Sequence, residues 1–137
     1  MSWWRRGEKG DPRRALGRQG EDLAARHLKR LGYSILERNV RTSFGEIDLI
    51  ARQGDLLIFV EVKTKKTGAF TPPELSVDRR KQRKLTSLAL EYLARKGGEK
   101  WGCRFDVVAV TLPPGGRPEV LHIRDAFRPQ EGGSYRS

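Results

Sequence analysis

Apolar residues recur at two different spacings along the chain, and each spacing predicts a different kind of element. Leucine recurs at helical spacing over residues 16–31, and Gly32 stands where the C-terminal cap of a helix belongs. A second amphipathic helix is predicted over residues 77–95, where one face carries Leu85, Leu88, Ala89, Tyr92 and Leu93.

Shorter apolar runs lie between the two predicted helices and after the second one. Gln53-Gly54-Asp55 is typical of a hairpin turn, and Gly68 with Pro72-Pro73 indicates a loop over residues 65–75. The runs predict strands over residues 33–39, 46–51, 56–64, 105–110 and 120–123. The resulting order, α-β-β-β-α-β-β, predicts an α/β fold with a mixed β-sheet core flanked by helices.

The chain has 137 residues, which predicts a single domain. Residues 1–16 contain glycine, proline, tryptophan and basic residues without an apolar period, so we interpret them as a basic flexible arm. Residues 129–137 are predicted to form a flexible tail, which leaves the domain at residues 17–128. Within the arm, Trp3-Trp4-Arg5-Arg6 either contacts a partner or is a solvated tail.

The charge balance favours a polyanionic partner. The chain carries 28 lysines and arginines against 17 aspartates and glutamates, a net charge of +11. Such a surplus indicates nucleic acid or an anionic membrane surface, but no apolar stretch approaches the ~20 residues of a membrane span. The N-terminus lacks the apolar core of a signal peptide, and a single cysteine, Cys103, excludes an intrachain disulfide, so a cytoplasmic location is expected. Because His27 and His122 are the only other soft ligands, a cysteine-rich zinc site is excluded.

Acidic side chains interrupt two of the apolar strands. Glu46 and Asp48 share one face of their strand, and Glu61 and Lys63 share one face of the next, because strand side chains alternate. A hairpin centred on Gly54 places Asp48 roughly opposite Glu61. A carboxylate in a core strand is costly unless it is paired or binds a metal. The group is therefore either a metal site or a structural salt bridge of Glu61 with Lys63 or with another neighbouring residue.

The metal-site interpretation has a clear chemical basis. Mg²⁺, or Mn²⁺ in its place, prefers oxygen ligands and is commonly held by one or two carboxylates and a substrate phosphate. A bound metal lowers the pKa of its water and stabilises charge on the phosphate oxygens. A neighbouring lysine can orient the water or neutralise developing negative charge. Two carboxylates and a lysine on one patch are what metal-assisted phosphodiester cleavage needs.

Three segments in this order resemble the YraN-like family of small bacterial proteins. They are Gly20-Glu21, then Gly45-Glu46-Ile47-Asp48-Leu49-Ile50-Ala51, then Phe59-Val60-Glu61-Val62-Lys63. The resemblance covers about residues 17–128, and it extends to the PD-(D/E)xK nuclease superfamily and the archaeal Holliday-junction resolvases. It implies a restriction-endonuclease-like fold.

The resemblance also implies roles for individual residues. Asp48 and Glu61 would be metal ligands, Lys63 the catalytic lysine, and Glu21 a helix-borne acid that completes the site. The chain departs from the superfamily name in having Ile47, and not proline, before Asp48. Without the resemblance, Glu21 is equally well explained as a helix-start carboxylate that interacts with the helix dipole.

Several further residues are secondary candidates. Lys65, Lys66 and the 65–75 loop are predicted to face backbone phosphates. On the second helix, Arg79 and Lys81 belong to a basic run and Gln82 faces inward. Nucleases similar to the resolvases have a helix glutamine or lysine beside the metal site, so the resemblance implies that Lys81 and Gln82 lie beside the metal or contact phosphate.

Three other polar residues are assigned structural alternatives. His27 is predicted to be a packed, hydrogen-bonded histidine, and Asp106 a hydrogen-bonding residue at a strand end. Glu46 is either a second acid or the partner of an arginine.

Three functions remain in view. The first is a Mg²⁺-dependent endonuclease that hydrolyses DNA, including branched or damaged structures. The second is a nucleic-acid-binding protein of the same fold with little or no catalytic activity, and the third is a basic RNA-associated protein. The chain lacks an RNP-type strand motif, a P-loop and a G-x-S-x-G motif. By analogy with the resolvases, a homodimer is expected when nucleic acid is bound.

Overall fold

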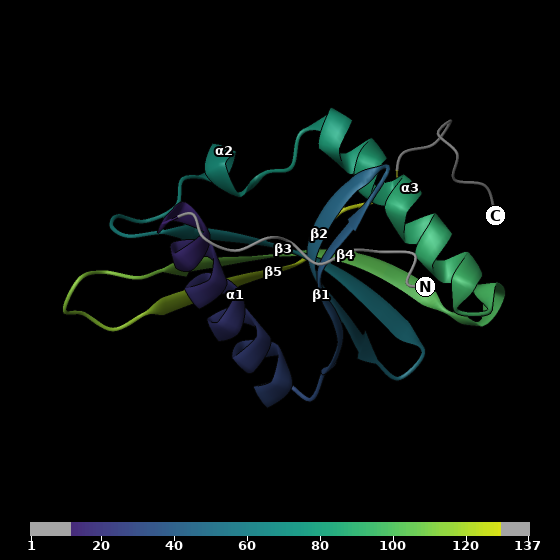
Figure 1. Cartoon of the computed structure of the whole chain (residues 1–137), viewed down its shortest axis with the longest axis horizontal. Helices are drawn as coiled ribbons and strands as arrows, with labels where there is room; N and C mark the ends of the chain where they lie inside the picture. Colours follow the sequence, from purple (N-terminus) through teal and green to yellow (C-terminus); the bar gives the residue numbers. More distant parts are fainter. Residues whose placement is uncertain (1–11, 130–137) are drawn as a thin grey trace.

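The computed structural model describes residues 12–129, which form a twisted sheet with helices on both sides (Figure 1). The strands follow one another in the order β1-β2-β3-β4-β5. Neighbouring strands are antiparallel except β3 and β4, which are parallel and are connected through α3. The elements are α1 (Pro12–Arg30), β1 (Ser34–Thr42), β2 (Gly45–Gln53), β3 (Leu56–Lys65), α2 (Pro72–Leu75), α3 (Arg79–Arg95), the 3-10 helix η1 (Gly98–Lys100), β4 (Gly102–Thr111) and β5 (Glu119–Phe127).

The predicted α/β class and the order of the main elements are confirmed. Two short elements are additional, η1 and α2, of which α2 lies inside the predicted 65–75 loop. A capping box explains α2: the Thr71 side chain accepts the Glu74 N–H, and the Glu74 carboxylate accepts the Thr71 N–H. The T-x-x-E spacing that forms this box is visible in the sequence.

The first helix is longer than predicted. It begins at Pro12 and therefore takes in residues 12–16 of the segment interpreted as a flexible arm. Proline suits the first turn of a helix, because the N–H that it lacks would have no partner there. Trp3-Trp4-Arg5-Arg6 and most of the predicted tail lie outside the described residues. No helix within residues 12–129 combines the length and apolar character needed to cross a membrane.

Two apolar clusters fix the helices on opposite faces of the sheet. The cluster that joins α3 to the sheet includes Phe59, Leu85, Leu88, Tyr92 and Phe105. The cluster that joins α1 to the sheet includes Ala24, Leu28, Leu49, Val60 and Val108. Because side chains alternate along β3, Glu61 and Lys63 continue the Phe59 side of the strand, toward α3.

Gly20 sets how closely α1 approaches β3. A Cβ atom at this position would lie 2.0 Å from Thr64 Oγ1 and 3.0 Å from Thr64 Cβ. The absence of a side chain therefore allows the middle of α1, with Glu21, to lie directly on the second half of β3. Because α1 begins at Pro12 and has no acidic residue in its first turn, the alternative that Glu21 is a helix-start carboxylate is wrong.

We expect Gly20→Ala to destabilise the protein by about 1–3 kcal/mol, because the added methyl group must displace α1 from the sheet. Gly17→Ala is the matched control: nothing lies within 4 Å of the added Cβ, so the better helix propensity of alanine should stabilise by up to about 1 kcal/mol. Urea denaturation of both variants measures the difference. Stabilisation of equal size in both variants would show that the contact with Thr64 imposes no constraint.

Candidate active site

Strand β2 separates from β3 at Asp48. Strand β2 pairs with β3 from Gln53 opposite Leu56 to Leu49 opposite Val60. Beyond this point β2 continues to pair only with β1, and the hairpin of β1 and β2 rises away toward α3 (Figure 1). Asp48 lies at the branch, where its Oδ2 accepts the Val62 N–H at 2.7 Å. A side-chain oxygen thus satisfies an amide that the departing strand leaves behind.

Glu61 and Lys63 follow directly on β3. Glu61 is one residue past the last pair with β2, and its side chain is only 12% exposed. Its Oε2 accepts a hydrogen bond from Lys81 Nζ of α3 at 2.6 Å. Pairing of β3 with β4 is unbroken from Leu56 to Lys65, so Lys63 lies on the same face as Glu61, one repeat further along.

Glu21 completes the group from α1. Its side chain is half-buried, and its Oε1 is buried without a hydrogen-bond partner among residues 12–129. Burial raises the pKa of Glu21, an effect that the Asn39 side chain and the charge of Arg38 only partly oppose. Asp48 also interacts with this carboxyl group. The structure therefore brings Glu21 and Glu61 to Asp48 from three elements.

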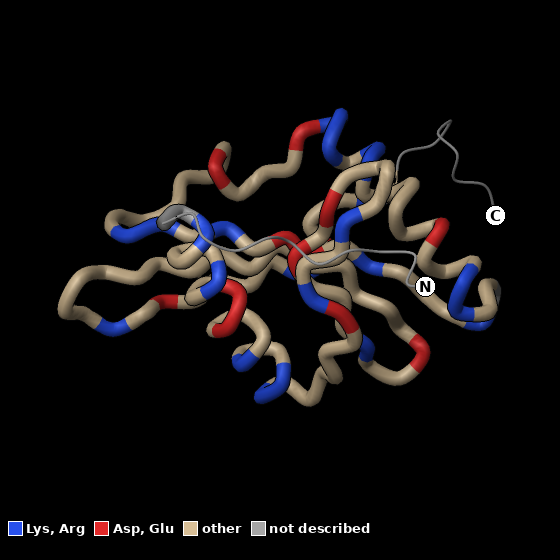
Figure 2. The backbone as a smooth tube through the Cα atoms, in the orientation of Figure 1, with Lys and Arg blue, Asp and Glu red and all other residues tan. Residues whose placement is uncertain are grey.

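The cluster of Glu21, Asp48 and Glu61 carries an excess of negative charge. Burial and then the charge of Glu61 raise the pKa of Asp48 to about 8, with Glu21 adding to the effect and the Val62 N–H and Lys81 opposing it. Although burial would lower the pKa of Lys81, its hydrogen bond and attraction to Glu61 raise it. In Figure 2 acidic positions gather near the centre of the molecule, where β2 and β3 lie. Such a site favours a bound proton or a cation.

The donor set suits a hard divalent cation, because carboxylate oxygens are the ligands that Mg²⁺ prefers. The orphaned Oε1 of Glu21 and the mutual repulsion of Asp48 and Glu61 point the same way. Within residues 12–129, however, no three acidic, histidine or cysteine side chains are already arranged to hold a metal ion. The Lys81 ammonium group is instead the cation on Glu61.

The basic residues predicted to face phosphates differ in whether their side chains are already paired. Lys65 is engaged within its own loop: its Nζ donates to Ala69 O at 3.1 Å and to Glu74 Oε1 at 3.0 Å. Lys66 and Arg79 are exposed. The hydrogen bonds of Lys65 close the loop onto α2, a role that the sequence analysis missed because the T-x-x-E motif was not recognised.

Gln82 and Glu46 lie at the edge of the site. Gln82 is half-buried, as expected of an inward-facing residue, and its Nε2 donates to Val77 O at 2.6 Å, which holds the segment that leads into α3. Glu46 is exposed and pairs with Arg41 at 3.0 Å. Of the two alternatives for Glu46, the structure shows the arginine partner.

A second polar cluster lies on the α1 side of the sheet. Asp106 is buried and accepts hydrogen bonds from Arg104, from the Asp125 N–H and from His122 Nε2, the last at 2.8 Å. His122 Nδ1 lies 3.2 Å from His27 Nε2. His27 is thus a packed, hydrogen-bonded histidine and Asp106 a hydrogen-bonding residue, as predicted. The predicted position of Asp106 at a strand end is wrong, because β4 begins at Gly102 and Asp106 lies buried in its middle. His27 and Asp106 are both part of the structural support for the sheet.

Burial alone would raise the pKa of Asp106, but its hydrogen bonds from His122, Arg104 and the Asp125 N–H lower it to about 2. A lowered carboxyl pKa stabilises the folded state above the unfolded pKa of about 4, and the stabilisation is lost as the pH falls toward about 2. We expect Asp106→Asn to cost about 2–4 kcal/mol at pH 7, because charged donors lose their acceptor in the interior.

The difference between Asp106→Asn and the unmodified protein should shrink between pH 4 and pH 2, measured by chemical denaturation at each pH. Asp55→Asn, at an exposed hairpin turn, is the control and should have little effect. A constant difference across this pH range would contradict the assigned role of the carboxylate.

Comparison with solved structures gives distant similarity, as one example illustrates. The structure of Pyrococcus furiosus SfsA in complex with Ca²⁺ aligns with a TM-score of 0.39 and 15% sequence identity, over 88% of this chain and 74% of that chain.

Comparison with known sequences gives much stronger matches. The chain is 49% identical over 122 residues to a UPF0102 protein of Geotalea daltonii, covering 89% of this chain and 96% of that protein. It is 46% identical over 121 residues to one of Geobacter sulfurreducens, covering 88% and 94%. A UPF0102 protein of Rhodococcus jostii is 49% identical over 114 residues, covering 82% and 96%. The model of the uncharacterised protein family UPF0102 matches residues 20–110, a span that contains all the carboxylates of the site, and the chain belongs to this family.

Proposed function

We propose that this protein is a metal-dependent endonuclease that hydrolyses DNA phosphodiester bonds. Its active site would lie at the point where β2 separates from β3. The observation that carries the proposal is the convergence of Glu21, Asp48 and Glu61 at that branch, with the pKa of Asp48 raised to about 8. A carboxyl group with a strongly perturbed pKa among like charges is a candidate functional group. The sequence resemblance to PD-(D/E)xK nucleases supports the same assignment.

Asp48 and Glu61 would hold Mg²⁺ or Mn²⁺, with Glu21 as the third acid. The ion would supply a water of lowered pKa and positive charge beside the phosphate oxygens. Lys81 would have to leave Glu61, and its ammonium group would then be available to a phosphate of the substrate. Lys63, on the same face of β3, is positioned to orient the attacking water or to neutralise charge that develops on the phosphate.

The basic surplus of the chain supports DNA as the partner. The net charge is +11. Lys66 lies exposed at the start of the segment that follows β3, and Arg79 lies exposed at the first position of α3. We propose that they contact backbone phosphates. Such contacts release counterions, so each one that is lost should reduce the slope of log affinity against log salt by about 0.9. On branched DNA, where two strands are cut, we propose a homodimer related by a two-fold axis.

Incubation of the purified protein with labelled linear, single-stranded, flap and four-way DNA tests the proposal. Parallel reactions should contain Mg²⁺, Mn²⁺ or EDTA, and light scattering of the free protein and of a complex with four-way DNA should report its assembly. We expect cleavage with Mg²⁺ or Mn²⁺ and none with EDTA. Absence of cleavage on every substrate and with both metals would overturn the proposal.

One observation favours a second candidate, a nucleic-acid-binding protein of this fold with little or no catalytic activity. The ion pair of Lys81 with Glu61 satisfies one of the proposed ligands without a metal ion. DNA binding that is identical with Mg²⁺ and with EDTA, together with an absence of cleavage, would select this candidate.

A further inference from the structure

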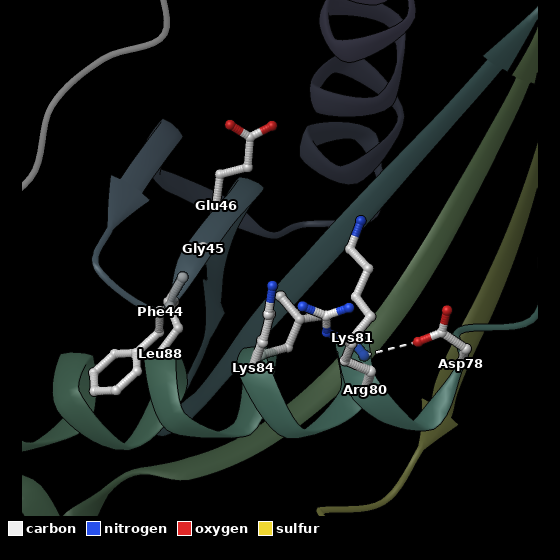
Figure 3. A pocket seen from close by; sticks show the side chains of 9 residues that line it. Phe44, Gly45, Glu46, Asp78, Arg80, Lys81, Lys84 and Leu88 are labelled. Atoms are coloured by element: carbon white, nitrogen blue, oxygen red, sulfur yellow. Dashed lines mark hydrogen bonds between the residues drawn. The ribbon is translucent and has the colours of Figure 1, made fainter.

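A groove separates the tip of the β1–β2 hairpin from the first half of α3. Phe44, Gly45 and Glu46 line it on the hairpin side, and Lys84, Leu85 and Leu88 are among the residues that line it on α3. Its volume is about 420 Å³, within the range of small-ligand sites in proteins. Figure 3 shows the Phe44 ring beside Leu88 over the helix, with Lys84 and Lys81 extending from α3 toward the strands.

The aromatic ring of Phe44 is held in an exposed position. Phe44 belongs to the turn that closes the pair Thr42 and Gly45, and its N–H donates to Thr42 Oγ1 at 3.0 Å. Gly45 follows with a φ of +136°, which glycine adopts without strain. Phe44 is 39% exposed although its side chain is large and apolar. The turn therefore fixes the backbone of Phe44 at the hairpin tip and leaves its aromatic ring partly exposed, where a flat partner can stack.

The groove is also positively charged. Of its two acids, Glu46 is paired with Arg41, and Asp78 accepts the Lys81 N–H as the N-cap of α3. Arg80 and Lys84 have no ion-pair partner within residues 12–129. The charge that remains suits phosphate groups on either side of the apolar floor.

The groove is continuous with the candidate active site. Lys81 lines the groove, and its Nζ reaches Glu61 Oε2 at 2.6 Å. A DNA strand whose phosphate lies at the carboxylates would therefore run past Lys81 and along α3 toward Phe44.

We propose that this groove binds one unpaired nucleotide of the DNA substrate, with its base stacked on Phe44 and its flanking phosphates on Arg80 and Lys84. A base inside a duplex is stacked on both sides and has no free face to offer the ring. The groove thus selects substrates that contain single-stranded or unpaired positions. This inference rests on the proposed function and names the feature of the substrate that its active site recognises.

Binding of fluorescently labelled DNA in EDTA tests the proposal separately from cleavage. Phe44→Ala should weaken binding to a single-stranded oligonucleotide by about tenfold or more, the usual effect of one lost base–aromatic stack, and should change duplex binding by less than about twofold. Phe44→Trp should restore single-strand binding. Leu121→Ala is the matched control, because Leu121 on β5 is 49% exposed and lies outside the groove.

A single abasic position, moved along the oligonucleotide, locates the stacked base. At one position, the missing base should weaken DNA binding by the unmodified protein as much as Phe44→Ala weakens it. The same abasic oligonucleotide should bind the Phe44→Ala variant no more weakly than the intact oligonucleotide does. Equal losses on single-stranded and duplex DNA, or no loss, would overturn this inference but leave the proposed nuclease intact. Failure of the unmodified protein to bind any DNA would overturn both.

Discussion

Asp48→Asn and Glu61→Gln are each expected to abolish metal-dependent cleavage while the fold remains intact. Each substitution removes an ionised oxygen that the proposed cation needs, and loss of one preorganised electrostatic group commonly reduces turnover by about 10²–10³-fold. The amide side chain introduced by Asp48→Asn would still offer an oxygen to the Val62 N–H, so the branch between β2 and β3 is retained. The measurement is the initial cleavage rate of each variant with Mg²⁺, on the substrate that the unmodified protein cleaves best.

Asp48→Asn is expected to affect stability differently from activity: it should not destabilise the folded protein. The pKa of Asp48 is raised from 3.8 to about 8 in the folded protein, so the folded state binds the proton more tightly than the unfolded state does. Ionisation of Asp48 therefore costs stability progressively as the pH rises from about 4 through about 8. In EDTA, Asp48→Asn should be as stable as the unmodified protein at pH 4 and equally or more stable at pH 8.5.

Two outcomes would contradict these assignments. Cleavage at the unmodified rate by either variant would show that its carboxylate is not a ligand. A markedly lower melting temperature of both variants at neutral pH would show that the carboxylates serve in structural salt bridges, such as the ion pair of Glu61 with Lys81.

Lys63→Ala is expected to slow cleavage by about 10²-fold or more and to change DNA affinity by less than about threefold. Its proposed charge acts on the phosphate as negative charge develops, so it contributes to the transition state and little to the bound ground state. Lys66→Ala is the matched control, since Lys66 is exposed and is proposed to contact a phosphate of the backbone. It should weaken binding and flatten the salt dependence while turnover at saturating DNA stays unchanged.

Single-turnover rates and equilibrium titrations of both lysine variants separate these roles. A Lys63→Ala variant that loses affinity and keeps its turnover would place Lys63 among the phosphate contacts.

Much of the fold was predictable because the hydrophobic period changes clearly between helices and strands. The turn at Gly54 fixes the register of β2 against β3, so the closeness of Asp48 and Glu61 follows from residues near each other in sequence. The ends of elements were less predictable, because local capping decides them. Thr71 and Glu74 create α2 in this way, and Pro12 begins α1 earlier than its first leucine suggests.

The contacts that depend on tertiary structure could not be predicted in detail. Lys81 belongs to a basic run, and nothing in that run distinguishes the residue that reaches Glu61, because the position of α3 over the sheet selects it. The groove at Phe44 depends on the curl of the β1–β2 hairpin toward α3, which no local pattern specifies. The network around Asp106 likewise joins β4, β5 and α1 across long stretches of chain.

The departure of β2 at Asp48 also leaves part of β3 as an open strand edge. Beyond Val60, β3 continues to Lys65 with β4 as its only neighbouring strand among residues 12–129. Unpaired edges invite edge-to-edge association of protein copies, and charged side chains oppose it. The strand changes from the apolar run Leu56–Val60 to alternating charges at this same point. We therefore expect Glu61, Lys63 and Lys65 to oppose edge-to-edge association, so that replacing all three with apolar residues promotes aggregation.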